Sequence, residues 1–371
     1  MAHAKDRIRV SFVCFNAYKL FNPKSAAQLG GTELQIHALA TTLSNHALFN
    51  VSCIVGDFGQ SRIEHRKKIT IISAFRLDKK IANLILAPIL FFRALRTAKP
   101  DIVISSPAGP EIGLLALYCF VYNAKYIFRT ASDVDCNLKK ERVLDPLSRF
   151  LYRIGIRYAH RIVVQHERQK NDMQSFYSRQ SSIISNGYDI PAHTITLAAR
   201  TNTIVWIGSS RLVKRADIFF SLVREFPQYQ FDMILSKSGD RRLYETYKQQ
   251  ANILSNLTFH GELSPADTNA IIKNSRILIG TSDYEGSPNA YIFASLYGTP
   301  ILSLNVACQG VCVQGNYESM KRELEKIMSN NTYANLLSEQ ELAYARANYD
   351  MKLVIQKWIS LIQETYYSQT Y

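Results

Sequence analysis

Glu285 is the side chain best placed for ligand chemistry, within the stretch TSDYEGSPNAYIFASLYGTP. The apolar run RILIG before it predicts a buried strand, so Glu285 would lie at the carboxyl edge of a parallel sheet, where open α/β sheets bind ligands. Pro288 favours a helix start here, and the backbone N–H groups of Gly286, Ser287 and Asn289 would face the same space. A carboxylate there can accept hydrogen bonds from sugar hydroxyls. The pattern also fits an exposed acid near a helix N-terminus.

Two basic residues follow another predicted strand, in VWIGSSRLVKRADIFFSL. The strand ends at Gly208, and Arg211 and Lys214 come in the loop before the next helix. A guanidinium and an ammonium group at the end of a strand suit a pair of phosphate groups. The alternative interpretation is a solvated basic turn.

Gly30 and Gly31 precede a helical pattern in QLGGTELQIHALATTL. Glycine lets a backbone approach a ligand closely, and free N–H groups at a helix start bind anions, so a diphosphate would fit. A plain tight turn fits as well. The glycines do not have the GxGxxG spacing, which argues against a nicotinamide dinucleotide site.

Neither a metal site nor a catalytic nucleophile is indicated. Asp133 and Asp135 form a D-x-D pair, which can hold Mn²⁺ with a nucleotide but is short and common. The six cysteines contain no CxxC pair and the eight histidines form no motif, so we expect each histidine to be structural or solvent-facing. The lack of a G-x-S-x-G elbow, a P-loop and H-E-x-x-H argues against hydrolase, kinase and zinc-peptidase functions. We therefore expect no metal and no other cofactor.

Strand-like and helix-like segments alternate along almost the whole chain. Continuous Val/Ile/Phe-rich runs predict strands covered on both faces, as in parallel sheets. These runs are 8–15, 50–55, 69–75, 101–106, 125–131, 161–165, 203–208, 230–236, 257–260, 276–281 and 300–304. The segments between them have helical spacing, as in the stripe Leu34, His37, Ala38 and Leu43. Repeated strand–helix units predict an α/β fold with doubly wound sheets, and we expect no strand after about residue 305.

The length of 371 residues predicts two domains, because a single core rarely grows so large. We expect two Rossmann-like doubly wound parallel-sheet domains that face a cleft. We expect the boundary between the two domains in the polar stretch 186–202, which gives a first domain of 1–190 and a second of 191–349. The amphipathic segment in 350–371 predicts a final helix that packs back on the first domain.

The formal net charge of +14 indicates an anionic partner: a membrane surface, nucleotide phosphates or nucleic acid. Nucleic acid is disfavoured, since no nucleic-acid module or basic tail is present. The apolar run 81–92 is too short to span a bilayer and contains Pro88. It is flanked by basic residues, namely Arg76, Lys79, Lys80, Arg93, Arg96 and Lys99. This predicts a surface helix on anionic lipid, and hence a cytoplasmic protein bound peripherally to the inner face of the membrane.

Taken together, these sites resemble a retaining glycosyltransferase of the GT-B fold, from family 4 of bacterial polysaccharide and lipid glycosylation. GGTELQIHALATTLS resembles the family's N-terminal GG-x-E helix, and IISNGYDI its Asn-Gly segment before the linker. VWIGSSRLVKRADIF resembles the diphosphate-binding loop, LTFHGELS the segment that lines the base, and DYEGSPNAYIFASLYGTPIL the E-G-x-P-N block. The similarity covers nearly the whole chain, with five fragments in the family's order.

The resemblance implies a role for each candidate residue. Arg211 and Lys214 would neutralise the diphosphate of a nucleotide-sugar donor, so departure of the nucleotide would need no metal. Glu285 would hold hydroxyls of the donor sugar. The sugar would be transferred, with retention of its anomeric configuration, to a lipid-linked or polysaccharide acceptor in cell-surface glycan synthesis. The other implied substrate contacts are Gly30, Gly31, Asn186, Gly208, Gly286, Ser287, Pro288 and Asn289.

The sequence also departs from the family pattern. The position eight residues after Glu285, where the family has a second glutamate that grips the ribose, is Phe293. Each hydrogen bond to a charged group contributes about 1.5–3 kcal/mol, so donor affinity would fall by about tenfold to several hundredfold. The histidine that contacts the donor sugar in many members has no counterpart between 66 and 159, and Asp133 is the candidate for an acceptor or sugar contact.

These departures leave more than one function open. The first hypothesis is an active glycosyltransferase. The second is a catalytically degenerate GT-B protein that binds a sugar or a partner enzyme as a scaffold. The presence of Arg211, Lys214 and Glu285 favours the active glycosyltransferase. A non-transferring enzyme such as a sugar-nucleotide epimerase is a third, and its general acid/base residues are not evident.

Overall fold

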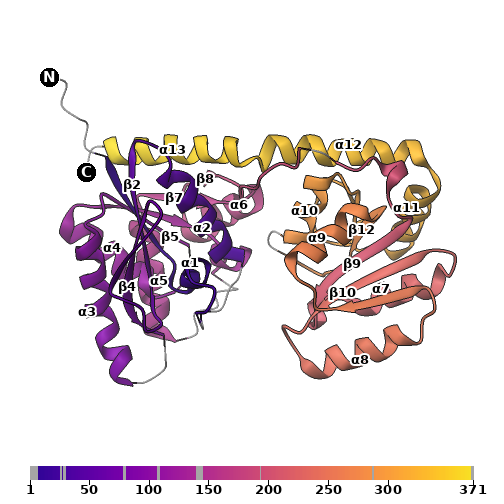
Figure 1. The fold of residues 1–371 in the computed structure, drawn as a ribbon, viewed down its shortest axis with the longest axis horizontal. Coiled ribbons are helices and arrows are strands. Elements are labelled where there is room, and N and C mark those ends of the chain that lie inside the picture. The colour runs from indigo at the N-terminus through magenta and orange to yellow at the C-terminus, as the bar shows by residue number, and fades with distance from the viewer. Residues whose placement is uncertain are drawn as a thin grey trace. The chain divides into compact units, whose positions relative to one another are not determined.

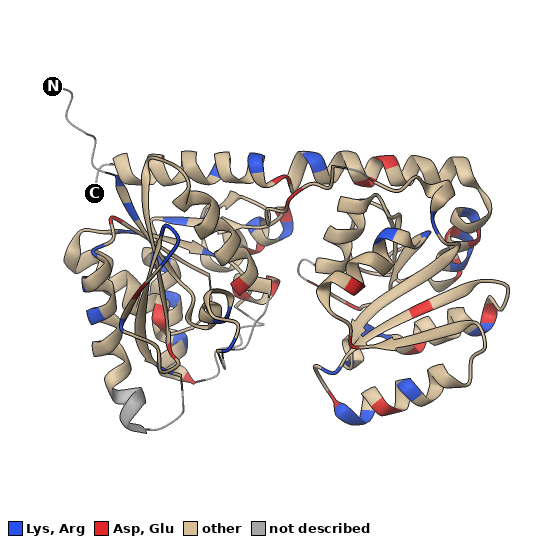
Figure 2. Cartoon of the chain, in the orientation of Figure 1, with Lys and Arg blue, Asp and Glu red and all other residues tan. Residues whose placement is uncertain are grey.

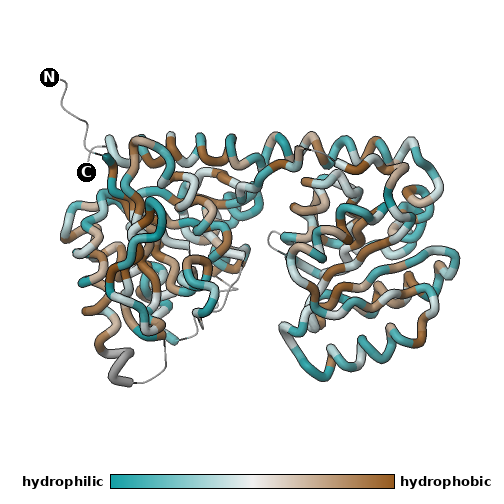
Figure 3. Tube along the Cα trace, in the orientation of Figure 1, coloured by the Kyte–Doolittle hydropathy of each residue, from teal (hydrophilic) through white to brown (hydrophobic). Residues whose placement is uncertain are grey.

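The structure is a computed structural model of the 371-residue chain. It describes residues 7–25, 27, 31–77, 81–106, 109–138, 145–192, 194–285 and 288–368, with the side chains of 81–85 left undescribed. The chain forms two compact units, Met1–Gly187 with Met351–Tyr371, and Tyr188–Asp350. In each unit the strands are among the most hydrophobic stretches (Figure 3).

The first unit contains an eight-stranded sheet in the order β3-β4-β2-β1-β5-β6-β7-β8 (Figure 1). Among the described strands of this unit, β3 and β4 pair antiparallel and all other pairings are parallel. From β4 to β7 the order is that of a Rossmann fold, whose topological switch point lies between β1 and β5. The strands are β1 (Ile8–Val13), β2 (Phe49–Asp57), β3 (Ile63–Arg66), β4 (Ile69–Arg76), β5 (Ile102–Ser105), β6 (Lys125–Arg129), β7 (Arg161–Val164) and β8 (Ser182–Ile183).

Helices cover both faces of this sheet. The main helices are α2 (Gly31–Ser44), α3 (Ile81–Ala98), α4 (Glu111–Tyr122), α5 (Pro146–Tyr158), α6 (Glu167–Tyr177) and α13 (Met351–Tyr367), with the short α1 (Tyr18–Phe21) after β1. Val10 and Phe12 of β1 pack in one core with α2 and with Trp358 of α13. Val13 belongs to a second core with α3, α4 and α5. The C-terminal helix therefore packs on the first unit, as the sequence predicts.

The second unit repeats the plan with a parallel six-stranded sheet in the order β11-β10-β9-β12-β13-β14. This is again the Rossmann order, and its switch point lies between β9 and β12. The strands are β9 (Thr203–Ser209), β10 (Gln230–Ser236), β11 (Leu257–Gly261), β12 (Ile277–Gly280), β13 (Ile301–Ser303) and β14 (Val311–Cys312). The predicted α/β class with two Rossmann-like domains is confirmed.

Alternating side chains of β9 build the two cores of the second unit. Ile204 and Trp206 pack with α7, α8, α11 and α12, while Val205 packs with α9 and α10 on the other face. The helices are α7 (Ala216–Glu225), α8 (Arg241–Asn252), α9 (Pro265–Asn274), α10 (Asn289–Tyr297), α11 (Tyr317–Ser329) and α12 (Asn331–Asn348).

Two details of the predicted elements are wrong. Strands do not stop near residue 305, since Val311 and Cys312 pair with β13; a two-residue strand leaves no apolar run in the sequence. The buried stripe of α2 consists of Ile36, Leu39, Ala40 and Leu43, whereas Leu34 is 48% exposed. The true stripe follows the i, i+3, i+4, i+7 spacing more closely than the predicted one.

The distribution of charged and apolar residues bears on membrane binding. Lys and Arg occur on many elements of both units rather than on one stripe (Figure 2). Within the described residues, no helix combines the length and the apolar character needed to cross a bilayer.

Candidate functional site

A pocket of about 330 Å³ lies at the switch point of the second sheet. Residues after β9 and residues after β12 line it, because the carboxyl ends of these neighbouring strands meet at one edge. The lining includes predicted site residues from two separate motifs, namely Gly208, Arg211, Lys214, Glu285, Pro288 and Asn289. The fold thus brings together most of the residues that the sequence singled out in this unit.

Hydrogen bonds between the two strand ends fix the position of Lys214. Its carbonyl oxygen accepts from Thr281 Oγ1 at 2.8 Å, and Trp206 Nε1 donates to that same Oγ1 at 2.8 Å. Asp283 N donates to the Val213 carbonyl at 2.9 Å. The turn that carries Lys214 is therefore attached to the segment that carries Glu285.

The ammonium of Lys214 forms an ion pair with Glu285 Oε1. The two side chains are only 14% and 20% exposed. Ser282 Oγ donates a further hydrogen bond to Glu285 Oε1 at 2.9 Å. Because the charges are mostly shielded from water, removing either partner would leave an unbalanced charge in the pocket.

Arg211 is the more accessible cation of the site. Its Nε donates to Ser209 Oγ at 2.9 Å, and the residue as a whole is exposed. No described residue occupies the other guanidinium donors, so they can bind an anion, and a guanidinium can bind two phosphate oxygens at once.

Two glycines shape the pocket wall. A Cβ at Gly208 would lie 2.2 Å from the Trp206 ring, and one at Gly280 would lie 1.7 Å from the hydroxyl of Tyr291. Tyr291 donates to Ser303 Oγ at 2.9 Å, and burial raises its pKa well above the usual value, so it stays neutral. Side chains at either glycine would displace an aromatic residue that lines the pocket.

The helix α10 begins at the pocket, with Pro288 as its N-cap residue and Asn289 as its first residue. Tyr188, the first residue of the second unit, donates its hydroxyl hydrogen to Asn289 Oδ1 at 3.3 Å. Gly286 and Ser287, which were also predicted to contact the donor, lie outside the described residues.

Phe293 is used in packing. Its ring lies edge-on to the ring of Tyr188, with centroids 5.4 Å apart, and it is half-buried beside Ile292 and Leu296. It is not among the residues that line the pocket.

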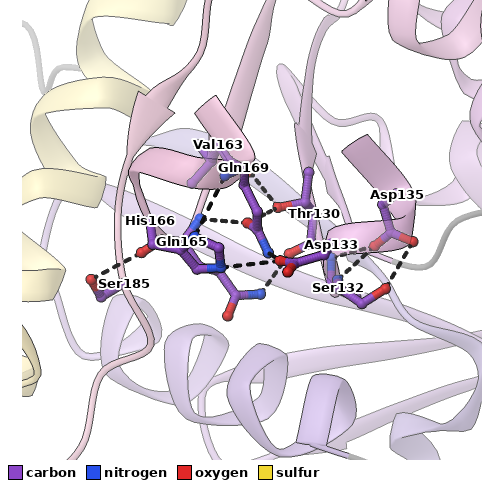
Figure 4. A network of polar contacts seen from close by, with 10 residues as sticks. Thr130, Ser132, Asp133, Asp135, Val163, Gln165, His166, Gln169 and Ser185 are labelled. Carbon is purple, nitrogen blue, oxygen red and sulfur yellow. Dashed lines mark hydrogen bonds and ion pairs between the residues drawn. The ribbon is translucent and has the colours of Figure 1, made fainter. Parts of the chain in front are cut away.

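The first unit carries a separate polar network after β6 and β7 (Figure 4). Gln169 Nε2 donates to Asp133 Oδ1 at 3.0 Å, and His166 Nε2 lies 3.1 Å from the same oxygen, although not aligned for a good hydrogen bond. Gln169 also accepts from Thr130 Oγ1 at 2.9 Å and from the backbone of Gln165 at 2.9 Å. No donor from the described part of the chain reaches Asp133 Oδ2.

Burial opposes ionisation of Asp133, but the contacts with His166 and Gln169 outweigh it and hold the pKa of this carboxyl below its usual value. The network thus presents a carboxylate with one oxygen held and one oxygen open. Sequence reasoning named Asp133 but missed His166 and Gln169. Their only signal was their place just after a predicted strand, which holds for many polar residues.

The D-x-D pair does not converge on a common point. Asp135 turns back to accept from the backbone N–H groups of Ala131 and Ser132, at 2.7 and 2.8 Å, as part of a capping box (Figure 4). Among the residues described, no group of three or more His, Cys, Asp or Glu side chains is arranged to hold a metal ion.

The remaining predicted residues belong to the first unit. Asn186 Oδ1 accepts from Arg129, a buried residue that also donates to Ser106 Oγ at 3.0 Å. Gly31 is exposed at the start of α2. Gly30 lies outside the described residues.

The sequence matches no protein-family model and no curated protein sequence. The structure, in contrast, is similar to several solved structures. A glycosyltransferase from Rickettsia africae superposes with a TM-score of 0.75 at 14% identity, covering 98% of this chain and 100% of that one. Sucrose-phosphate synthase from Thermosynechococcus elongatus gives 0.74 at 14% identity, covering 96% and 99%. The lipopolysaccharide outer core galactosyltransferase WaaB gives 0.65 at 15% identity, covering 96% and 99%.

These similarities span nearly the full length of each chain. At such low identity they show the fold alone. The fold is GT-B.

Proposed function

We propose that this protein is a glycosyltransferase that uses a nucleotide-diphosphate sugar as donor. The observation that carries the proposal is the pocket at the switch point of the second sheet, where Arg211, Lys214 and Glu285 converge from two strand ends. Cations suit the diphosphate and a carboxylate suits sugar hydroxyls. The fold supports the same function, since one similar structure, TarM, was solved with UDP and another, starch synthase IV, with ADP and acarbose.

The proposed roles follow from the geometry of the pocket. Lys214 and Arg211 neutralise the negative charge that develops on the departing diphosphate. Glu285 holds donor hydroxyls, and the start of α10 at Asn289 adds backbone N–H groups. Because Lys214 and Glu285 form an ion pair, a bound donor must either contact both side chains while they stay paired or separate them. We propose that transfer occurs with retention and without a metal ion.

The proposed acceptor is a lipid-linked glycan or a polysaccharide, in bacterial cell-surface glycan synthesis. Asp133 is the proposed acceptor or sugar contact, through its open oxygen. Exposed basic residues of α3, together with Ile89 at 64% exposure, support peripheral binding to an anionic membrane surface on its inner, cytoplasmic face.

Phe293 favours a second candidate function, a scaffold that binds a sugar or a partner without catalysis. Packing of Phe293 against Tyr188 places an aromatic ring where the resemblance implies a ribose-binding glutamate. Under this alternative the ion pair between Lys214 and Glu285 has a structural role only.

Calorimetric titration with UDP, GDP, ADP and their common sugars, with and without Mn²⁺, tests the proposal. We expect one nucleotide to bind without metal, and Lys214→Ala to weaken its binding about 100-fold or more, because a charge-assisted contact is lost and Glu285 is left unpaired. Arg241→Ala, at an exposed position of α8, is the matched control and should bind normally. Absence of binding to all three nucleotides would contradict the proposal and favour the scaffold.

A further inference from the structure

A second polar pocket, of about 530 Å³, lies at the opposite edge of the first sheet from the Asp133 network. It forms where β7 and β8 begin and where α6 ends. Its lining combines two guanidinium groups, an imidazole and three hydroxyls, from Arg161, Arg179, His160, Ser178, Ser181 and Ser182. The proposed glycosyl transfer uses none of these residues.

Among the described residues, the two guanidinium groups of this pocket bind backbone oxygens alone. Arg161 Nη1 donates to the His160 carbonyl at 3.0 Å. Arg179 donates to the carbonyl of Arg157 at 2.6 Å and to that of Ala159. No carboxylate of the described residues pairs with Arg161 or Arg179. Within the part of the chain that the structure describes, the positive charge of both side chains is therefore uncompensated.

Two further observations point to a missing anion. The Ser181 hydroxyl oxygen is buried and has no hydrogen-bond partner within the described part of the chain, which is costly unless a ligand or water supplies one. Burial, with Lys125, Arg161 and Arg179, lowers the pKa of His160 to about 4. Burial and the neighbouring Arg157 and Arg161 also lower the pKa of Arg179. The cations thus repel one another in a pocket that holds a free hydroxyl.

We infer that this pocket binds a phosphate group, through the guanidinium groups of Arg161 and Arg179 and the hydroxyl of Ser181. Planar guanidinium groups bind phosphate oxygens in pairs, and a serine hydroxyl donates to a third oxygen. The phosphate would come from a free phosphate ester or from the headgroup of a phospholipid. The site is distinct from the donor pocket, which lies in the second unit.

Titration with inorganic phosphate at constant ionic strength tests this inference, with the imidazole of His160 followed by NMR. A background with Arg211→Ala and Lys214→Ala removes both cations of the donor pocket. We expect saturable binding that raises the pKa of His160, because a nearby anion favours the imidazolium. Arg161→Gln should weaken binding about tenfold or more, since it removes a charged donor. Arg241→Gln should leave it unchanged.

Arg179→Lys is the second variant, because it keeps the charge but loses the planar pair of donors. It should weaken phosphate binding, and because it also loses the hydrogen bonds to the carbonyls of Arg157 and Ala159, the thermal unfolding midpoint is measured alongside so that binding is compared in the folded protein. A parallel titration with glycerophosphoglycerol, the soluble headgroup of phosphatidylglycerol, separates the two sources. Stronger binding of the diester indicates a lipid headgroup, and stronger binding of inorganic phosphate indicates a free phosphate ester. If neither ligand shifts the His160 resonances, or if Arg161→Gln and Arg241→Gln behave alike, the inference is wrong.

Discussion

The carboxyl edges of the two sheets hold different kinds of site. In the second unit, Lys214 and Glu285 form an ion pair beside Arg211, and all three line one pocket. In the first unit, Asp133 is held by His166 and Gln169, with one carboxylate oxygen open. The second unit therefore offers cations for a phosphate, whereas the first offers a carboxylate for a hydroxyl.

The two sheets therefore share a topology but differ in the charge at their carboxyl edges. Both sheets have the Rossmann order and both put loops at the same edge, so the fold alone does not distinguish donor from acceptor. Under the proposed function, the charge at each edge makes the distinction. A cationic site attracts a diphosphate, and an anionic site repels it but can accept a hydrogen bond from an acceptor hydroxyl.

The largest expected effect that tests this division is that of Asp133→Asn. If Asp133 contacts the acceptor, the rate of transfer should fall about 10- to 100-fold, as expected for loss of one hydrogen bond to a charged group. Donor affinity, measured by calorimetry, should not change.

Asp135→Asn is the matched control for this variant, because Asp135 lies in the same turn but caps it through Ala131 and Ser132. It should lower the thermal unfolding midpoint and spare the transfer rate of the folded enzyme. A loss of donor affinity in Asp133→Asn with an unchanged transfer rate would break the proposed division.

A smaller effect concerns the pH dependence of stability. Glu341 of α12 is fully buried against α10, where Ser295 Oγ donates to its Oε2, and burial raises its pKa to about 7. A raised pKa in the folded state means that stability is greatest below the unfolded pKa and falls as pH rises through about 7. For Asp133 the sign is opposite, since its lowered pKa makes stability fall at acidic pH.

Glu341→Gln should therefore raise the free energy of unfolding above pH 7, by on the order of 1 to 3 kcal/mol, and flatten its change between about pH 5 and 7. Chemical denaturation at several pH values measures this. Glu339→Gln, an exposed change on the same helix, is the control and should keep the wild-type profile. A Glu341→Gln variant that keeps the wild-type slope would show that Glu341 does not titrate as the structure indicates.

The last prediction concerns binding to an anionic membrane surface. Arg93 and Arg96 are exposed on α3, and each basic residue near an anionic surface contributes about 1 kcal/mol. The double change Arg93→Gln and Arg96→Gln should weaken binding to phosphatidylglycerol vesicles, measured by sedimentation, by about 30-fold, while donor binding stays normal. Removing Arg241 and Arg242 from the second unit should have little effect. Equal losses in both double variants would mean that net charge, not α3, controls binding.

The sequence predicts the second unit's site better than the first unit's network, for a physical reason. Lys214 and Glu285 each follow an apolar strand within a few residues, so the parallel sheet alone brings them together. The contact between Asp133 and His166 also joins two strand ends. Asp133, however, stands only in the short and common D-x-D pair, and His166 stands in no motif. Gln169 reaches the network because α6 begins just after β7.

The short strands could not be predicted from sequence patterns, for a related reason. β3 has the sequence IEHR and is largely exposed, so hydrophobic periodicity cannot reveal it. β8 and β14 have two residues each and exist because a longer strand lies beside them. The buried stripe of α2 was misplaced because Leu34 is apolar but faces outward.

Turnover of a nucleotide sugar shows whether the pocket of the second unit supports sugar transfer. Once titration has named the nucleotide, release of the nucleoside diphosphate from its common sugars is measured with a membrane extract as the source of acceptor, for wild type and Glu285→Gln. The proposed role of Glu285 predicts release by the wild type and about 100-fold slower release by Glu285→Gln. The affinity for the free nucleotide should not fall, because Lys214 loses its ion-pair partner and stays available for the diphosphate. If the wild type binds the nucleotide but releases none from any sugar, or if Glu285→Gln turns over normally, the account of the pocket as a sugar-transfer site is contradicted.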